Sequence, residues 1–142
     1  MAALRKLLRL DRKDRGLLIE ACALVLVVRI AQWVLPWKSL LGTMRWLPLP
    51  KRDRVAFDRL IWAVRSSGAR IPRATCLTKA LALQRRLNRS GYDAKVELGV
   101  AKTPTGRFEF HAWVEHLGEP LLDSADDLAR YSRLFTVETA SP

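Results

Sequence analysis

The feature that most constrains the fold is a helical pattern followed directly by two alternating segments. Residues 76–89 place apolar side chains three or four positions apart, and Gly91 follows as a stop signal. Residues 94–101 and 107–116 then alternate, with the turn sequence TPTG between them. A helix followed by a β-hairpin predicts an α+β fold, in which one helix packs on an antiparallel sheet of about three strands.

Most of the remaining chain is predicted to be helical. Helical patterns cover residues 1–10, residues 14–35 and residues 52–66, and the last of these is expected to end at the sequence SSG. Residues 36–50 contain three prolines and are predicted to form an irregular connector. A short helix is predicted over residues 126–133.

Charge divides the chain into two zones. The net charge is +11, and residues 1–73 hold 16 Lys and Arg against 5 Asp and Glu, whereas residues 74–142 hold 9 of each. We therefore predict a basic helical region over residues 1–72, which docks an acidic partner or peptide, and a separate domain over residues 73–142. The alternative is that the basic side chains only keep an apolar chain soluble.

Composition excludes several classes of protein. Apolar residues make up 49% and charged residues 27%, which is typical of a chain that buries a core. The two cysteines, Cys22 and Cys76, exclude a disulfide framework and a cysteine-rich zinc site. A reducing cytoplasm is the expected location.

Residues 17–35 form the most apolar stretch. Glu20 and Arg29 interrupt it, and the uninterrupted apolar run from Ala21 to Val28 is short, so no transmembrane helix is predicted. Two interpretations stay open: an amphipathic helix lying on a membrane, and a core helix of a helical bundle. The pattern favours the core helix, because its polar and apolar positions are poorly segregated.

Cys76 is a candidate nucleophile. Thr75 is a good N-cap residue, which places Cys76 in the first turn of its helix. There the helix dipole and the free N–H groups stabilise a thiolate, and Arg73 and Lys79 add positive charge. The same N–H groups are suited to an oxyanion that develops during acyl transfer. A buried, inert cysteine is the alternative.

His111 and Asp123 are candidate partners of this thiol. His111 lies in the middle of the second strand, whereas His116 lies at its end and projects from the opposite face. A turn at Gly118 returns the chain along this strand, which brings Asp123 within reach of Nδ1 of His111. Asp126 and Asp127 are rivals for this role, although both suit the start of the C-terminal helix. Nucleophile, base and orienting acid fit a thiol protease or acyl transferase.

A metal centre and a cofactor are not expected. One Cys, one His and one Asp make an incomplete ligand set for zinc.

These segments also resemble a known family. The stretches TCLTKALALQRRLNRSGYDAKVELGV and FEFHAWVEHLGEPLLDS are similar to the stand-alone transglutaminase-like leader peptidases of lasso-peptide biosynthesis. The resemblance implies a transglutaminase/papain-like core with Cys76 as nucleophile, His111 as general base and acid, and Asp123 as orienting carboxylate. It also implies that Trp113 forms a wall of the cleft.

The implied activity is removal of the leader from a ribosomally made precursor peptide, before a separate cyclase closes a macrolactam ring. The implied partners are the precursor and a separate leader-recognition protein, with the cyclase as a further candidate.

Two rival functions stay open. Amide transfer or deamidation uses the same three residues, since the acceptor decides the outcome. A non-catalytic basic protein that binds nucleic acid or anionic lipid is the other rival. No nucleic-acid-binding motif is recognisable, so nucleic acid is not an expected partner.

Overall fold

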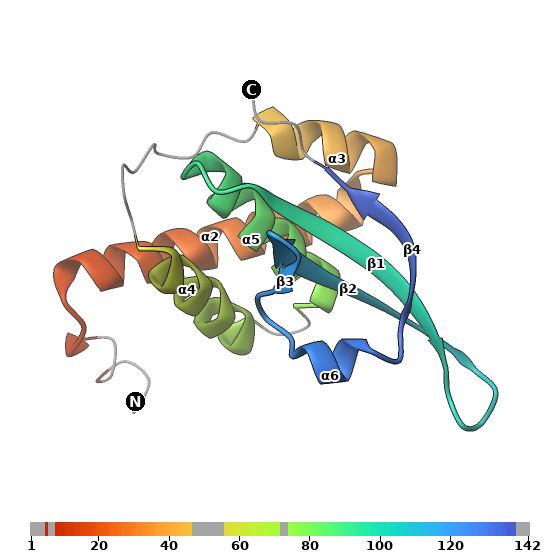
Figure 1. Cartoon of the computed structure of the whole chain (residues 1–142). Coiled ribbons are helices and arrows are strands. Elements are labelled where there is room, and N and C mark those ends of the chain that lie inside the picture. Colours follow the sequence, from red (N-terminus) through yellow and green to blue (C-terminus); the bar gives the residue numbers. More distant parts are fainter. Residues whose placement is uncertain (1–4, 6–7, 47–55, 72–73, 139–142) are drawn as a thin grey trace.

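The computed structural model describes residue 5 and residues 8–46, 56–71 and 74–138. Helices and a small antiparallel sheet make up an α+β fold, as expected from the sequence (Figure 1). The elements are, in chain order, α2 (Arg12–Val34), α3 (Trp37–Trp46), α4 (Phe57–Arg70), α5 (Cys76–Arg89), β1 (Ala94–Lys102), β2 (Phe108–His116), β3 (Glu119–Pro120), α6 (Ala125–Leu128) and β4 (Ser132–Val137).

Helix α5 lies at the centre of the molecule. It packs against β1 and β2 on one side and against α2 and α4 on the other (Figure 1). Every residue from 80 to 87 is buried, including Gln84, whose amide donates hydrogen bonds to the carbonyl oxygens of Ala94 and Val137. The helix therefore joins the sheet and the N-terminal helices into one hydrophobic core.

The sheet contains one strand more than expected. Its order is β3-β2-β1-β4, and β1 and β2 form the predicted hairpin, with His111 opposite Gly99. The prediction of a helix over residues 126–133 is wrong beyond Leu128: the chain turns there, and residues 132–137 pair with β1 as an edge strand. A break in the β1–β4 register lies at Leu98 and Gly99.

Two helix boundaries in the N-terminal half also differ from prediction. Residues 37–46 of the predicted irregular connector form α3, because Pro36 begins a helix here and its carbonyl accepts from the N–H of Leu40. Residues 47–50 of that connector and most of residues 1–10 lie outside the described residues. Helix α4 continues through the sequence SSG to Arg70.

Helix α2 has two different apolar faces. Asp11 caps its start, and it ends at Val34, ahead of Pro36, as predicted. One face is buried against α4 and α5, through Leu17, Leu18, Ala21, Leu24, Val25 and Val28. The other face is exposed, so the core-helix interpretation holds for half of the helix circumference.

By length and hydropathy α2 also qualifies as a membrane-spanning helix, a test that core helices of soluble proteins pass too. In its most apolar 18-residue window, one third of the residues are buried.

The predicted domain division falls at residues 72 and 73, which lie outside the described residues. The hydrophobic core nevertheless includes side chains from both sides of that point, such as Val64 and Leu83. The assignment of the basic region to partner docking stays a prediction.

Candidate active site

Cys76 is the first residue of α5. Thr75 has extended backbone angles, and its hydroxyl accepts a hydrogen bond from the N–H of Thr78, so it caps the helix as predicted. The thiol is half-buried and not in a disulfide. Cys76 belongs to the first turn of α5, where backbone N–H groups have no intrahelical carbonyl partner and are suited to an oxyanion. Of the two expected cations, Lys79 lies one turn along the helix, and Arg73 lies outside the described residues.

His111 and Asp123 form a hydrogen-bonded pair. Nε2 of His111 lies 3.0 Å from Oδ1 of Asp123, and both side chains are about three-quarters buried, with 22% and 25% of their surface exposed. The prediction named Nδ1 as the bonded nitrogen; the structure uses Nε2 instead. Nδ1 is therefore the nitrogen left to exchange a proton with a thiol.

The aspartate is held differently from the prediction. Strand β3 contains only Glu119 and Pro120, so Asp123 lies in a bend beyond it rather than on a longer strand. The two rival aspartates belong to α6, as predicted. Asp126 is exposed, and the carboxylate of Asp127 accepts a hydrogen bond from the hydroxyl of Ser124, which caps that helix.

His116 lies away from this pair. Its ring packs against Phe57 and Tyr92, and its Nδ1–H donates to the carbonyl oxygen of Asp93. His116 therefore lies outside the candidate site, and His111 is the histidine that bonds a carboxylate.

The imidazole of His111 belongs to a cluster of three rings that contact one another. Its centroid lies 6.2 Å from that of Trp113 and 5.2 Å from that of Tyr131, and the Trp113 and Tyr131 centroids are 6.3 Å apart. Trp113 is 2% exposed, and its ring covers Gly99, where a Cβ atom would lie 2.9 Å from the indole. The rings of Trp113 and Tyr131 thus pack beside the imidazole that bonds Asp123.

Tyr131 is fixed by two charged neighbours. Its hydroxyl donates to the carboxylate of Glu109 at 2.9 Å and accepts from Arg130 at 2.8 Å, and Arg130 also pairs with Glu109 through both nitrogens of its fork. Burial first, and then the Glu109 carboxylate, raise the pKa of Tyr131 above 10.0, and a Cys76 thiolate adds to this rise. The hydrogen bond from Tyr131 lowers the pKa of Glu109.

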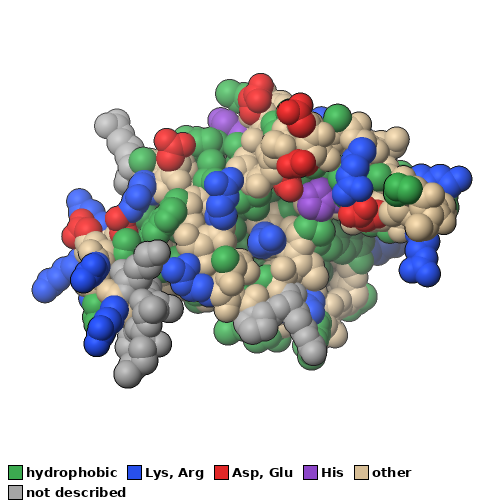
Figure 2. Space-filling view, turned by 90° about the horizontal axis from the view of Figure 1, so that it is seen from below, with side chains coloured by type: hydrophobic (Ala, Val, Ile, Leu, Met, Phe, Trp, Pro, Cys, Tyr) green, Lys and Arg blue, Asp and Glu red, His purple; other side chains and the backbone are tan. Residues whose placement is uncertain are grey.

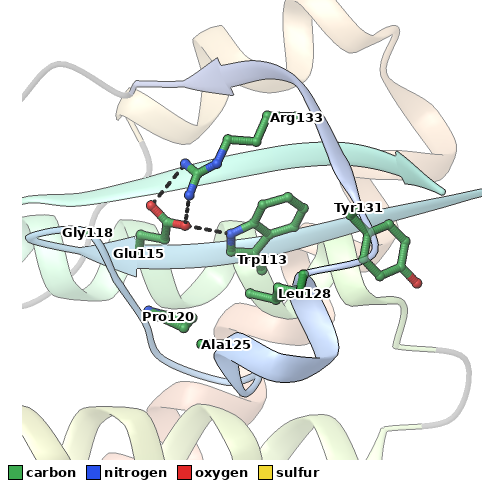
Figure 3. Close-up of a pocket in the computed structure, with 9 residues that line it drawn as sticks. Trp113, Glu115, Gly118, Pro120, Ala125, Leu128, Tyr131 and Arg133 are labelled. Atoms are coloured by element: carbon green, nitrogen blue, oxygen red, sulfur yellow. Dashed lines mark hydrogen bonds and ion pairs between the residues drawn. The ribbon is translucent and has the colours of Figure 1, made fainter.

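A pocket of about 300 Å³ opens beside these rings. Figure 3 shows Arg133 reaching over it to Glu115, whose carboxylate also accepts from the indole N–H of Trp113 at 2.9 Å. Trp113, Tyr131 and Leu128 line the pocket (Figure 3). Trp113 thus lines this pocket although its indole is buried, whereas Cys76, His111 and Asp123 are not among the pocket's lining residues, so its role as a wall of the catalytic cleft stays a prediction.

Helix α5 connects the thiol to this arrangement. It packs against β2, the strand that carries His111, and Cys76 lies close enough to influence the charge of Tyr131. Among the described residues, no hydrogen bond joins Sγ of Cys76 to His111, whose Nε2 bonds Asp123. A thiol, an imidazole and a carboxylate are the kinds of group that enzymes of the cysteine-protease or transglutaminase type use.

Comparison with known protein families places the chain in one superfamily. Residues 21–136 match the transglutaminase-like superfamily. The chain belongs to that superfamily. Activity of the cysteine-protease or transglutaminase type is typical of its fold, and the match includes α2 to α4 as well as the thiol and the sheet. Comparisons with curated proteins and with solved structures find no significant match.

Sequence reasoning missed the residues around Tyr131. Side chains alternate between the two faces of a strand, so the sequence alone places Glu109 on the same face of β2 as His111. The proximity of Arg130 and Tyr131 to His111 was not predicted, because residues 126–133 were assigned to one helix. The exposed aromatic-basic sequence RYSRLF after a short helix was the available sign of a turn and an edge strand.

Proposed function

We propose that this chain is a cysteine endopeptidase that removes the leader peptide from a ribosomally made lasso-peptide precursor. The observation that carries the chemistry is the 3.0 Å bond between His111 and Asp123, on a strand against which the Cys76 helix packs. The resemblance of both motifs to leader peptidases supports the substrate class.

The first half of the reaction forms a thioester. Nδ1 of His111 takes the thiol proton of Cys76, while Nε2–H donates to the Asp123 carboxylate and stabilises the imidazolium. Sγ attacks the carbonyl carbon of the peptide bond between leader and core. The backbone N–H of Cys76 stabilises the resulting oxyanion. The carbon–nitrogen bond then breaks, and His111 gives its proton to the departing amine of the core peptide.

The second half hydrolyses the thioester. His111 removes a proton from a water molecule, the hydroxide adds to the carbonyl carbon, and the thiolate leaves with the carboxylic acid of the leader as product. The thiolate regains its proton from the imidazolium. The bond to Asp123, together with contacts to the rings of Trp113 and Tyr131, favours one orientation of the imidazole through both proton transfers.

The proposal includes partners. The precursor is bound with the help of a separate leader-recognition protein, and a macrolactam cyclase acts afterwards, in the cytoplasm. The excess of basic residues in the N-terminal half supports docking of an acidic leader or partner. Of three arginines suited to this role, Arg52 and Arg54 lie outside the described residues, and Arg59 is held by Asp14 and stacks over Trp62.

Cleavage of the precursor peptide encoded beside this chain, followed by mass spectrometry, tests the proposal. We expect a leader fragment with the wild-type protein and the recognition protein, and none with Cys76→Ala or His111→Ala. His116→Ala is the matched control, because the second histidine binds a backbone carbonyl away from the site. Unchanged cleavage by Cys76→Ala would exclude the proposed nucleophile.

Amide transfer is a second candidate, supported by the family itself. The thioester is the same, but an amine replaces water as the acceptor. The cleavage assay repeated with an added primary amine separates the two functions. A product heavier by the mass of the amine, formed in preference to the acid, favours transfer over proteolysis.

A further inference from the structure

The outward face of α2 is an exposed apolar stripe. At 3.6 residues per turn, its members occupy a sector of about 120° of the helix. They are Ile19, Ala23, Leu26, Val27, Ile30, Trp33 and Val34. Trp33 and Val34 are 71% and 72% exposed, and exposed Trp37 continues the stripe into α3. A contiguous apolar face of this kind marks an interaction surface.

The opposite face of α2 decides how a partner meets this stripe. Leu18, Val25 and Val28 are fully buried, and α2 packs against both α4 and α5. A helix held in a protein core along one side cannot be surrounded by lipid. The stripe is therefore available to a flat surface and not to a bilayer that encloses the helix.

The charges beside the stripe are unbalanced. Arg12 lies in the same sector as Ile19 and Ile30, with exposed Arg9 and Lys13 next to it. Figure 2 shows basic side chains gathered at the end of the molecule where α2 begins (compare Figure 1). Lys38 is exposed at the other end.

The acids of α2 do not offset these cations. Asp14 is paired with Arg59 of α4, and Glu20 with Arg86 of α5 at 3.3 Å. The exposed carboxylate of Asp11, which accepts the N–H of Arg12, offsets one of the three exposed cations Arg9, Arg12 and Lys13, so a cationic excess remains. The surface presented by the stripe and its ends is thus apolar and cationic.

We propose that the stripe on α2 docks the protein onto an anionic membrane surface, with the helix parallel to the bilayer. Apolar side chains enter the boundary of the acyl chains, and the cations at both ends face acidic headgroups. Trp33 and Trp37 are exposed at the end of α2 opposite Arg12, where indole rings suit the headgroup layer. Docking does not depend on peptide cleavage.

Flotation of the full-length protein with lipid vesicles tests this proposal. We expect binding to vesicles of phosphatidylcholine mixed with phosphatidylglycerol, weaker binding to phosphatidylcholine alone, and weaker binding at high salt. The Cys76→Ala variant should bind like the wild type, so a failure of docking is distinguishable from a failure of the proposed protease.

Two pairs of variants distinguish binding through the stripe from non-specific adsorption to the vesicles. Ile30→Gln/Val34→Gln should weaken binding at least about tenfold, whereas Leu117→Gln/Leu134→Gln removes exposed apolar side chains elsewhere and should not. Arg12→Glu/Lys13→Glu should weaken binding by about thirtyfold or more. Its matched control is Lys102→Glu/Arg107→Glu in the β-hairpin.

Three outcomes would overturn the proposal. One is no binding to phosphatidylglycerol vesicles, and another is equal loss of binding in the stripe and control variants. The third is a dimer in light scattering that Ile30→Gln/Val34→Gln converts to a monomer, since a second copy would then cover the stripe. Circular dichroism confirms that each variant is folded.

Discussion

Strand β2 presents two chemically different faces. On the α5 side, Ala112 and Val114 are buried in the hydrophobic core. On the other side, His111, Trp113 and Glu115 belong to a layer of aromatic rings, ion pairs and hydrogen bonds. The first face contributes burial of apolar area, which is non-directional; the second contributes bonds that depend on angle as well as distance.

This difference separates stability from orientation. A core can repack around a changed methyl group and keep its outline, whereas a hydrogen bond to an imidazole works only with its donor and acceptor in line. We therefore expect substitutions on the apolar face to change the free energy of unfolding, and substitutions around His111 to change the rate of catalysis. The following variants test that division.

Asp123→Ala should have the largest effect. The imidazole loses the acceptor of its Nε2–H, so the imidazolium formed during attack is no longer stabilised. We expect kcat for precursor cleavage to fall by about 10³-fold or more, with little change in the urea midpoint. Asp126→Ala, on exposed α6, is the control and should cleave normally. Equal activity in the two variants would remove Asp123 from the catalytic residues.

Val114→Ala should destabilise the fold without impairing the chemistry. Two methyl groups leave a fully buried site, and we expect a loss of about 2 kcal/mol in the free energy of unfolding. Phe110→Ala is the control from the same face, since Phe110 is exposed beyond the helix. Urea unfolding measures both. A smaller loss for Val114→Ala than for Phe110→Ala contradicts the assignment of this face to stability.

Gly99→Ala tests the close packing of Trp113 and β4 against Gly99 of β1. The new methyl group would lie 2.9 Å from the indole of Trp113 and 3.0 Å from the carbonyl oxygen of Ser132, so the ring or β4 must shift. We expect a loss of about 1 kcal/mol in stability and a reduced kcat. Gly42→Ala, with open space around it in α3, should instead stabilise by about 0.5 to 1 kcal/mol.

Glu109→Gln should have the smallest effect, visible only in acid. The folded-state pKa of Glu109 lies below 4.5, first because of the Tyr131 hydrogen bond and then because of Arg130, although burial opposes the shift. The unfolded chain binds this proton more readily, so the stabilisation is present above the ordinary pKa and lost as pH falls through the lower, folded-state pKa.

Urea midpoints measured between about pH 5 and about pH 3 check this prediction. The wild type should lose stability over that interval more steeply than Glu109→Gln, which lacks the titrating group. Identical slopes would mean that Glu109 does not act through its charge.

The segment from Thr75 to His116 was the most predictable part of the chain. A capping threonine, a regular apolar period and glycines at positive φ define α5 and the hairpin almost to the residue. These signals are local, so a single sequence contains them. The pairing of His111 with an acid near residue 123 was also predictable, because a tight turn at Gly118 fixes the register of the returning chain within a residue or two.

Elements that depend on distant partners were not predictable. Helix α4 continues through Ser67 and Gly68, where the hydroxyl of Ser67 accepts a hydrogen bond from Sγ of Cys22 in α2 and Gly68 leaves room for the side chain of Lys79. Strand β4 is exposed along most of its length, so no alternation marks it. The stripe on α2 was invisible for a related reason: a helix that is apolar on all sides does not show which side is covered.

The burial of α5 has a consequence for motion at the site. Backbone amides of residues 80–87 lie inside the core, so their hydrogens should exchange with solvent only when the whole chain unfolds. Residues 121–131, in a bend and a short exposed helix, should exchange through local opening. The thiol is thus at the first turn of the helix whose later turns exchange most slowly, whereas the carboxylate belongs to a segment expected to open locally, and adjustment to a bound peptide falls to the side that carries Asp123.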